Sequence, residues 1–367
     1  MIYPDNLNVI WLFGSFNLTK TIKMNKLTTI ILFFLSFSVF SQSIGIGEWR
    51  DELPYREAIA VAESDEIVYG ITPYSLFTLR KDNESMNRYS KIDGLSDFGM
   101  SALEYNDEKE VLFIAYSNTN IDLVKEGNII NISDIKRKQI LGKKTINNIH
   151  FIDNIAYLSC GFGIVLVDID REEVKDTWYI GDDGNALEIF DIANLNGFLY
   201  AATEQGIRKA ELSNPNLADF QSWEIVTEIP HYDAVFDQIE VHEGRILTNY
   251  HPNNNMDEIY VFENEVWTPL TLNSNQRITN ICSGDLWFYI IRTYGIDLYN
   301  TDLTFERNVY TYSFTSSTYP TDVSEDSDGS IWLSDRVNGL LNTRNFQFLC
   351  SLISINIKIC PNFYQIF

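Results

Sequence analysis

A unit of 41 to 47 residues recurs seven times along the chain, and this repetition restricts the fold more than any other feature. Each unit contains an apolar strand, a short polar turn, a second strand with an aromatic residue, and another turn before a third strand. Repeats of this length are the signature of solenoids, propellers and similar arrays. The first turns fall at Asp65-Glu66, Asp107-Glu108, Asp153-Asn154, Asn196-Gly197, Glu243-Gly244, Gly284-Asp285 and Asp328-Gly329.

The turns and the strands that follow them both predict an all-β protein. Asn-Gly and Asp-Gly suit two-residue hairpins because these residues tolerate a positive φ. Each turn is followed by an apolar pair, as expected of a second strand packed on both faces: Val68-Tyr69, Leu112-Phe113, Ala156-Tyr157, Leu199-Tyr200, Ile246-Leu247, Leu286-Trp287 and Ile331-Trp332. A second turn needing a left-handed residue is predicted at Asn120-Ile121, Gly163-Ile164, Gly206-Ile207, Gly295-Ile296 and Gly339-Leu340.

Late aromatic residues indicate a fourth strand in most units, at Tyr89, Trp178, Trp223, Trp267 and Tyr310, with a weaker counterpart at Ile129–Ile132. The seventh unit lacks such a strand, but Gly47–Arg50, which contains Trp49, precedes the first unit and can complete it. We therefore predict an all-β, seven-bladed β-propeller over residues 42–344, with the N-terminal strand closing the last blade. Closure removes the exposed sheet edge that would otherwise pair with other chains. An open β-solenoid is the alternative, although its coils would be shorter and would lack paired hairpin turns.

The residues from Met24 have the three parts of a secretory signal. Lys26 is the basic start, Leu27–Phe40 is apolar, and small residues precede a predicted cleavage between Ser41 and Gln42. The apolar stretch is short for a bilayer-spanning helix, so a membrane anchor is the less favoured alternative and the mature chain is expected to have none. Residues 1–41 are thus an upstream extension plus signal peptide, with Met24 as the expected true start.

The tail 345–367 differs sharply from the rest, since it contains no Asp or Glu and only Lys358 as a basic residue. This shift suggests a truncation or frameshift product. A genuine last strand is the alternative, because Ile and Ser alternate around Leu352–Ile359.

Acidic residues dominate the predicted propeller, with 50 acidic and 23 basic residues between Gln42 and Arg344. The resulting field repels phosphate and disfavours nucleic acid as a partner. An anionic ligand would need a local basic pocket or bridging cations.

No motif in the sequence carries recognisable catalysis, so we expect no enzyme activity, no catalytic residues, no metal site and no cofactor. His150, His231, His242 and His251 lack metal-ligand spacing, and Cys160 and Cys282 are expected to be buried thiols. Cys350 and Cys360 lie in the tail, and no disulfide framework is implied. Asp326–Gly329 has part of a calcium-loop pattern but is expected to form a turn. The ligand-binding residues are unknown, and the inserted loop Tyr250–Glu258 of the fifth unit is the one local binding hypothesis.

Two resemblances to known families rest on particular residues. Asp93–Asp97 with Ser101–Leu103, and Val323–Asp326 with Gly329–Leu333 and Gly339-Leu340, resemble the repeat of two-component-regulator propellers. Trp49–Arg56, followed by Gly70-Ile71-Thr72, resembles the N-terminus of PorZ proteins of the bacterial type IX secretion system. The second likeness covers about residues 45–344.

The PorZ resemblance implies a non-enzymatic, exported protein that reaches the cell surface and associates with the outer membrane. Its implied partners are anionic lipopolysaccharide and the sortase complex that attaches this glycolipid to secreted cargo. The family pattern has a second propeller and a sorting domain, whereas this chain ends after one propeller. The alternatives are the periplasmic sensor propeller of a two-component regulator and a secreted, glycan-active propeller enzyme.

Overall fold

The computed structural model describes residues 56–252, 256–312, 318–327 and 329–343. The chain divides into two units, Met1–Arg50 and Asp51–Phe367. The predicted leader, the cleavage site at Ser41 and Gln42, and the tail 345–367 lie outside the described residues. Within the described residues, the second unit forms six four-stranded sheets and one sheet with three strands, all of them antiparallel.

The strands follow the predicted repeat. The first sheet contains β1 (Ala60–Glu63), β2 (Ile67–Ile71), β3 (Leu76–Arg80) and β4 (Met86–Tyr89), and the second β5 (Met100–Asn106), β6 (Val111–Tyr116), β7 (Ile121–Lys125) and β8 (Asn128–Ile132). The third contains β9 (Ile146–Ile152), β10 (Ile155–Cys160), β11 (Gly163–Asp168) and β12 (Glu173–Trp178), and the fourth β13 (Ile189–Leu195), β14 (Phe198–Thr203), β15 (Gly206–Glu211) and β16 (Glu224–Ile225). The fifth contains β17 (Phe236–His242), β18 (Arg245–Tyr250), β19 (Glu258–Glu263) and β20 (Val266–Pro269), and the sixth β21 (Ile278–Ser283), β22 (Phe288–Arg292), β23 (Gly295–Tyr299) and β24 (Phe305–Val309). The seventh contains β25 (Pro320–Glu325), β26 (Ile331–Asp335) and β27 (Gly339–Thr343).

Only short helical segments interrupt the described strands. They are η2 (Lys91–Asp93), α2 (Asp134–Arg137), η3 (Asp182–Gly184) and η4 (Phe220–Ser222).

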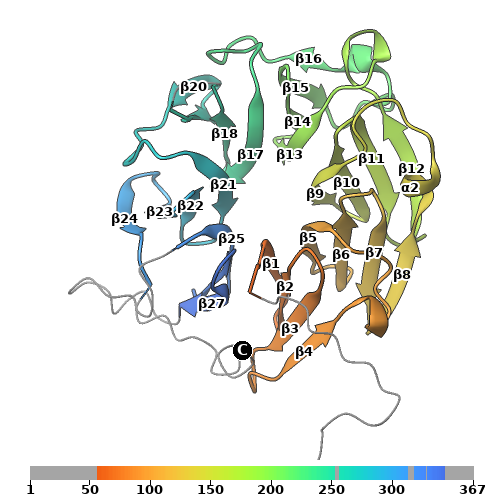
Figure 1. The fold of residues 1–367 in the computed structure, drawn as a ribbon. Helices are drawn as coiled ribbons and strands as arrows, with labels where there is room; N and C mark the ends of the chain where they lie inside the picture. The colour runs from red at the N-terminus through yellow and green to blue at the C-terminus, as the bar shows by residue number, and fades with distance from the viewer. Residues whose placement is uncertain (1–55, 253–255, 313–317, 328, 344–367) are drawn as a thin grey trace, which may run out of the picture. The chain divides into compact units, whose positions relative to one another are not determined.

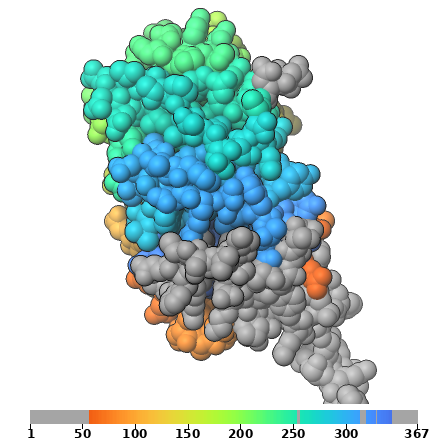
Figure 2. Space-filling model, turned by 90° about the vertical axis from the view of Figure 1, so that its left-hand side faces the viewer, coloured from red at the N-terminus to blue at the C-terminus, as the bar shows by residue number. Residues whose placement is uncertain are grey.

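The seven sheets are arranged as the blades of a propeller. In every sheet the strands pair in chain order, and the first strand of each lies nearest the centre (Figure 1). These first strands contact one another around a closed ring, from β1 through β5, β9, β13, β17, β21 and β25 back to β1. In the space-filling view, the teal and blue residues of the fifth and sixth blades form one continuous surface (Figure 2). The predicted seven-bladed propeller is confirmed.

Direct contacts between the first and last blades close the ring. The Val61 amide donates to Asp322 Oδ2 at 3.1 Å, and Thr321 Oγ1 donates to the Ala58 carbonyl at 3.1 Å. Lys81 Nζ lies 2.9 Å from carboxylate oxygens of both Glu63 and Asp326, which belong to these two blades. The predicted closing strand with Trp49 lies outside the described residues, so its place in the last blade stays a prediction.

Three of the predicted first turns have a left-handed residue at their first position. Asp153, Asn196 and Glu243 have φ values of 52°, 51° and 49°, in the left-handed region. At the second turns, Gly163, Gly206 and Gly339 also have a positive φ, as predicted.

Three details of the prediction are wrong. In the second blade the left-handed residue is Thr119 (φ 65°) rather than Asn120. Gly295 does not need a left-handed φ; it is required because a Cβ there would lie 2.0 Å from the Tyr310 ring. Leu286-Trp287 precedes β22, which begins at Phe288. Glu325 of the next blade accepts both backbone N–H groups of this pair, while the Trp287 carbonyl accepts from the Gly284 amide at 2.9 Å.

The core lies between neighbouring blades. Every residue of the second strands β6 and β10, and of the third strand β11, is buried. Burial on both faces explains the continuous apolar runs of these second strands. Between the second and third blades, for example, Phe113, Ile149 and Leu158 belong to one cluster. Each such side chain contributes about 1.5–3 kcal/mol of transfer free energy when it is fully buried.

Alternating strand direction gives the propeller two different faces. The turns from first to second and from third to fourth strands lie on one side, here named the turn face. The remaining hairpins and the loops between blades lie on the other, the loop face. The described turn-face connections contain 17 acidic residues: Asp65, Glu66, Asp82, Glu84, Asp107, Glu108, Glu110, Glu126, Asp153, Asp170, Glu172, Asp219, Glu243, Glu265, Asp285, Asp302 and Asp326; their basic residues are Lys81, Lys109 and Arg171.

The loop face is much closer to neutral. Its described connections contain ten acidic residues, Asp93, Asp97, Asp134, Asp182, Asp183, Glu188, Glu204, Glu228, Asp233 and Asp257, and eight basic ones, Lys91, Lys136, Arg137, Lys138, Lys143, Lys144, Arg277 and Arg336. Nine of the twelve exposed large hydrophobic residues identified in the described part of the chain also lie on this face: Tyr74, Ile92, Phe98, Leu141, Tyr232, Met256, Tyr294, Tyr319 and Val337.

Candidate functional site on the loop face

The loop that joins the first two blades has a fixed conformation. Ser90 and Asp93 form a capping box around η2, in which the Ser90 amide donates to Asp93 Oδ2 at 2.9 Å. Gly94 then takes a left-handed φ of 114°, and Leu95 is buried. This anchoring holds Ser96–Phe98 at the loop face; Ser96 and Asp97 end the segment Asp93–Asp97 that resembles regulator propellers.

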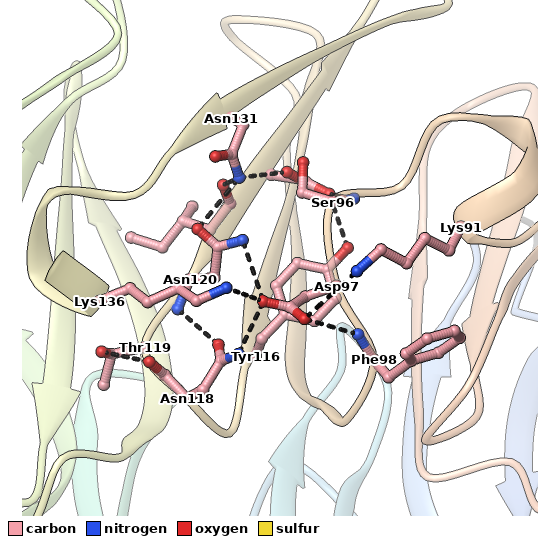
Figure 3. Close-up of polar contacts among 12 residues, drawn as sticks. Lys91, Ser96, Asp97, Phe98, Tyr116, Asn118, Thr119, Asn120, Asn131 and Lys136 are labelled. Atoms are coloured by element: carbon pink, nitrogen blue, oxygen red, sulfur yellow. Dashed lines mark hydrogen bonds and ion pairs between the residues drawn. The ribbon is translucent and has the colours of Figure 1, made fainter.

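Asp97 is the centre of a polar cluster at this point (Figure 3). Asn118 Nδ2 donates to Asp97 Oδ2 at 2.7 Å, and Lys91 and Lys136 approach the carboxylate from opposite sides. Burial acts to raise the pKa of Asp97, but the hydrogen bonds from Lys136 and Asn118 outweigh it and leave the pKa lowered. The carboxylate is therefore charged at neutral pH and holds two loops together.

A second carboxylate, Asp122, lies beneath this cluster and is fully buried. It accepts hydrogen bonds from the Ser96 amide at 2.8 Å, the Tyr116 hydroxyl at 2.6 Å and Asn131 Nδ2 at 2.8 Å. Burial, together with the nearby Asp122 carboxylate, raises the pKa of Tyr116. Asp122 thus supports the loop above it, because removing a buried acceptor would leave these donors unsatisfied.

A basic patch lies beside Asp97 on the loops 90–99 and 133–145. It consists of Lys91, Lys136, Arg137, Lys138, Lys143 and Lys144, and these two loops contain only Asp93, Asp97 and Asp134 as acidic residues. Lys144 Nζ donates to the carbonyls of Lys136 and Lys138, at 2.7 Å and 3.0 Å, which fixes the chain as it leaves α2. Lys143 Nζ contacts Glu188 Oε1 of the next loop at 2.5 Å.

Three exposed apolar side chains belong to the same two loops. Leu141, between Lys138 and Lys143 in the sequence, is 86% exposed. Ile92 and Phe98 are 60% and 48% exposed, and Lys91 Nζ lies 5.3 Å from the centre of the Phe98 ring. Sequence reasoning missed this surface, although the basic run from Lys136 to Lys144 is visible in the sequence.

A shallow hollow of about 340 Å³ lies beside the basic patch, between α2 and the outer strand β12. Asp134, Ile135, Lys138, Ile140, Glu173, Val174 and Thr177 line it. Its ionisable side chains are two acids and one lysine, so this hollow does not favour an anionic ligand.

The loop Tyr250–Glu258, predicted as a binding loop, is tied to the next blade at its described end. Asp257 is buried; its Oδ1 lies 2.6 Å from His251 Nδ1, and its Oδ2 accepts the Ile278 amide at 2.5 Å. Residues 253–255 lie outside the described part. The binding hypothesis for this loop stays a prediction.

The other residues considered from sequence have structural contacts. His150 Nε2 pairs with Asn194 Oδ1 at 2.7 Å, His242 Nδ1 with Ser283 Oγ at 3.0 Å, and His231 stacks on Tyr250 with centroids 4.3 Å apart. Cys160 is fully buried, as predicted, and Cys282 is only partly buried. The described side chains contain no group of three or more His, Cys, Asp or Glu placed to hold a metal ion.

Four acids on the first strands form a separate group around the propeller axis. They are Glu104 of β5, Asp191 of β13, Glu240 of β17 and Asp322 of β25, here named the axial acids. Burial, with repulsion from neighbouring carboxylates, raises the pKa of Glu104 to about 8, and burial raises that of Asp191 to about 7. Burial likewise raises the pKa of Asp322 to about 6 and that of Glu240. Glu104 and Glu240 nevertheless keep part of their surface exposed to solvent.

Comparison with known proteins supports the resemblance noted in the sequence. A family model for the N-terminal β-propeller domain of PorZ, of the type IX secretion system, matches residues 68–224. The predicted resemblance to this propeller is confirmed by that match. No curated protein sequence matches the chain.

Solved structures share the propeller fold. A PorZ structure, described as an essential bacterial surface component of the type IX secretion system of Porphyromonas gingivalis, aligns with a TM-score of 0.66 and 18% identity. The alignment covers 81% of this chain and 38% of that one, so the chain spans well under half of the PorZ structure.

Two other solved structures align less closely than PorZ. The β-propeller domain of Cps50 (Swd1) from Myceliophteria thermophila gives a TM-score of 0.59 and 8% identity, covering 80% of this chain and 98% of that one. The extracellular domain of a protein described as a hybrid two-component system from B. thetaiotaomicron gives 0.53 and 13%, covering 71% and 35%. At these identities the likenesses show the fold alone.

Proposed function

We propose that this chain is a non-enzymatic binding and scaffold module of the type IX secretion system, exported to the cell surface and associated with the outer membrane. The observation that carries the proposal is the match of residues 68–224 to the N-terminal propeller domain of PorZ. The propeller supports it further, because convergent loops on a rigid ring are a common platform for binding. Among the described residues, no helix is long and apolar enough to cross a bilayer.

The test is deletion of the gene in its own bacterium. We expect cargo proteins of the type IX system to accumulate unprocessed inside the envelope, measured by cell fractionation and immunoblotting. A protein exported by another route serves as the control and should be unaffected. An epitope-tagged chain should also co-purify with the sortase complex. Normal cargo display in the deletion strain would refute the proposal.

The domain limits are part of the same proposal. Residues 1–41 are an extension plus leader that begins functionally at Met24, residues 42–344 are the propeller, and residues 345–367 are an atypical tail from a truncation or frameshift. N-terminal sequencing of the exported protein should find Gln42 as the first residue. A mature protein that still begins at Met24 would contradict the predicted cleavage after Ser41.

The proposed ligand is anionic lipopolysaccharide, delivered to the sortase complex, and this rests on the PorZ resemblance. Because the chain has a net charge of −24, such a ligand needs local cations to offset the long-range repulsion. Calorimetry with the mature chain should detect binding of anionic lipopolysaccharide, and no binding after its charged groups are removed chemically. Equal affinity for the two forms would count against recognition of the charge.

A sensor propeller of a two-component regulator is the second candidate, because the extracellular domain from B. thetaiotaomicron has the same fold. The deletion strain separates the two functions. A sensor is expected to alter the transcription of a defined set of genes while cargo processing stays normal. The scaffold role predicts the opposite pattern.

A further inference from the structure

The basic patch is a positive surface on a strongly acidic protein. Its two loops contain six basic and three acidic residues, whereas the whole chain has a net charge of −24. The Asp97 cluster fixes the geometry of the patch, since Asp97 contacts both Lys91 and Lys136. A rigid surface loses little entropy on binding, so it is well suited to recognition.

The two loops of the basic patch also expose apolar side chains that a partner could bury. Leu141 is 86% exposed, and Ile92 and Phe98 are 60% and 48% exposed. Interfaces between proteins combine such apolar anchors with a polar rim. The aliphatic Leu141 gains free energy only by leaving water against another apolar surface.

We infer that the basic patch, with Leu141, Ile92 and Phe98, docks an acidic segment of a partner protein that also presents apolar side chains. This deepens the proposed scaffold role and rests on it only for where the partner is found. Charge complementarity selects the acidic segment, because basic residues outnumber acidic ones on the two loops. Arg137 and Lys143 remain 70% and 61% exposed although each contacts one carboxylate, Asp134 at 3.0 Å and Glu188 at 2.5 Å, so both can also contact a partner.

A flat anionic membrane fits the surface less well than a protein. A plane would approach the whole loop face, including Asp182, Asp183, Glu228 and Asp233, which would be repelled by the headgroups. A protein can contact the patch alone. An anionic sugar chain is also less favoured, because the adjoining hollow is lined by Asp134 and Glu173 with only Lys138 as a cation.

The test places the photoreactive residue p-benzoylphenylalanine at position 141 of the full chain, expressed in its own bacterium. Irradiation should join it to a protein, and mass spectrometry should locate the join in a segment rich in Asp or Glu. The same probe at position 266, where the native valine is 56% exposed on the turn side, is the control and should give little product.

Charge reversal then tests the cations directly. R137E with K138E should lower the crosslink yield at position 141 by at least about fivefold. The matched control is R171E with K175E, an equal charge change at exposed sites outside the patch, and it should leave the yield unchanged.

The alternative outcomes refute the inference. In the crosslinking experiment, these outcomes are a glycolipid adduct at position 141, a yield no greater than that at position 266, or a crosslinked protein segment without acidic residues. In the charge-reversal experiment, the outcome is an equal loss of yield from both pairs of substitutions. Co-purification of the tagged wild-type chain with the sortase complex is scored separately. If that complex is recovered while crosslinking fails, the docking inference is wrong and the scaffold role stands; if it is absent while crosslinking succeeds, the scaffold role is wrong.

Discussion

The surroundings of Glu104 and Glu240 disfavour the charged form of each carboxyl group. Both lie on first strands beside the carboxylates of Asp191 and Asp322. Desolvation and repulsion favour the protonated forms, and the apparent titration belongs to the four axial acids together. A carboxyl whose pKa is raised by folding stabilises the fold while it is protonated, and that stability is lost as the pH rises through its folded pKa.

Replacing Glu104 with Gln removes one charge from the axial acids. The pKa of Glu104 rises from 4.5 to about 8 on folding, so the wild type should lose stability between about pH 4.5 and pH 8. Glu104→Gln is expected to raise the melting temperature by about 2–4 °C at pH 8.5 and to change it little at pH 5. Calorimetric scans across this range measure the effect.

Glu108→Gln is the control for this prediction, because it removes the same charge from an exposed turn. It should not reproduce the pH-dependent gain. If Glu104→Gln shifts the melting temperature equally at both pH values, repulsion among the axial acids is not the cause.

The axial acids could not be predicted from the sequence, whereas the Asp97 loop could in part. Asp93–Asp97 lies in one short segment, and its capping box follows local rules. The Asp322 carboxylate acts on Glu104 only because the ring closes, and no spacing in the sequence indicates that the two interact. The basic residues from Lys136 to Lys144 are visible in the sequence. Their proximity to Phe98 is not, because it depends on the ion pair of Lys136 with Asp97, which links the two loops.

Two hairpins of the fourth blade show why particular glycines are needed. Gly206 has a φ of 90°, and a Cβ there would lie 2.0 Å from the Tyr232 carbonyl oxygen. Its amide also donates to the Ala234 carbonyl at 2.7 Å. Gly197, on the turn face, has a φ of 79°, and a Cβ there would have no atom within 4 Å. A substitution at either site strains the backbone, whereas only a substitution at position 206 also creates a steric clash.

Gly206→Ala is expected to destabilise the protein much more than Gly197→Ala. The left-handed backbone costs an alanine about 1–2 kcal/mol at either site. Only position 206 adds a clash with a loop between blades, which should bring its loss to about 3 kcal/mol or more. Urea unfolding measures both free energies, and equal losses would show that the close approach has no energetic role.

At this scale the sequence predicted the elements well where the signal was local. Asn196-Gly197 encodes its own turn, because both residue types tolerate the positive φ that the turn requires, and in Glu243-Gly244 the glycine supplies this tolerance. Leu286-Trp287 was assigned to a strand, but β22 begins at Phe288, and the acceptor for the amides of this pair is Glu325 of another blade. The apolar character of the pair does not reveal this acceptor, which lies far away in the sequence.

Ring closure is a property of the whole molecule, and Asp322 contributes to it. Asp322 Oδ1 accepts from Asn280 Nδ2 at 3.1 Å, and its Oδ2 accepts from the Val61 amide at 3.1 Å. Asp191 makes the same two contacts with Asn148 Nδ2, at 2.6 Å, and the Ile239 amide, at 3.0 Å. One carboxylate joins the first and last blades and the other joins blades that follow in sequence.

Asp322→Ala and Asp191→Ala should each cost about 1–3 kcal/mol, because a buried amide loses its acceptor. The location of the damage should differ. Hydrogen exchange should accelerate in β1–β4 and β25–β27 for Asp322→Ala, and in β13–β20 for Asp191→Ala. The same exchange pattern in both variants would mean that Asp322 has no special part in closure.

The unequal charge of the two faces gives the molecule a permanent electric dipole along its axis. A negatively charged molecule that approaches the protein is repelled least on the loop face, and a positively charged one is attracted most to the turn face. Two binding partners of opposite sign would thus arrive from opposite directions and need not compete for the same surface. Added salt screens these electrostatic forces, and their range falls to about 10 Å at 0.1 M ionic strength.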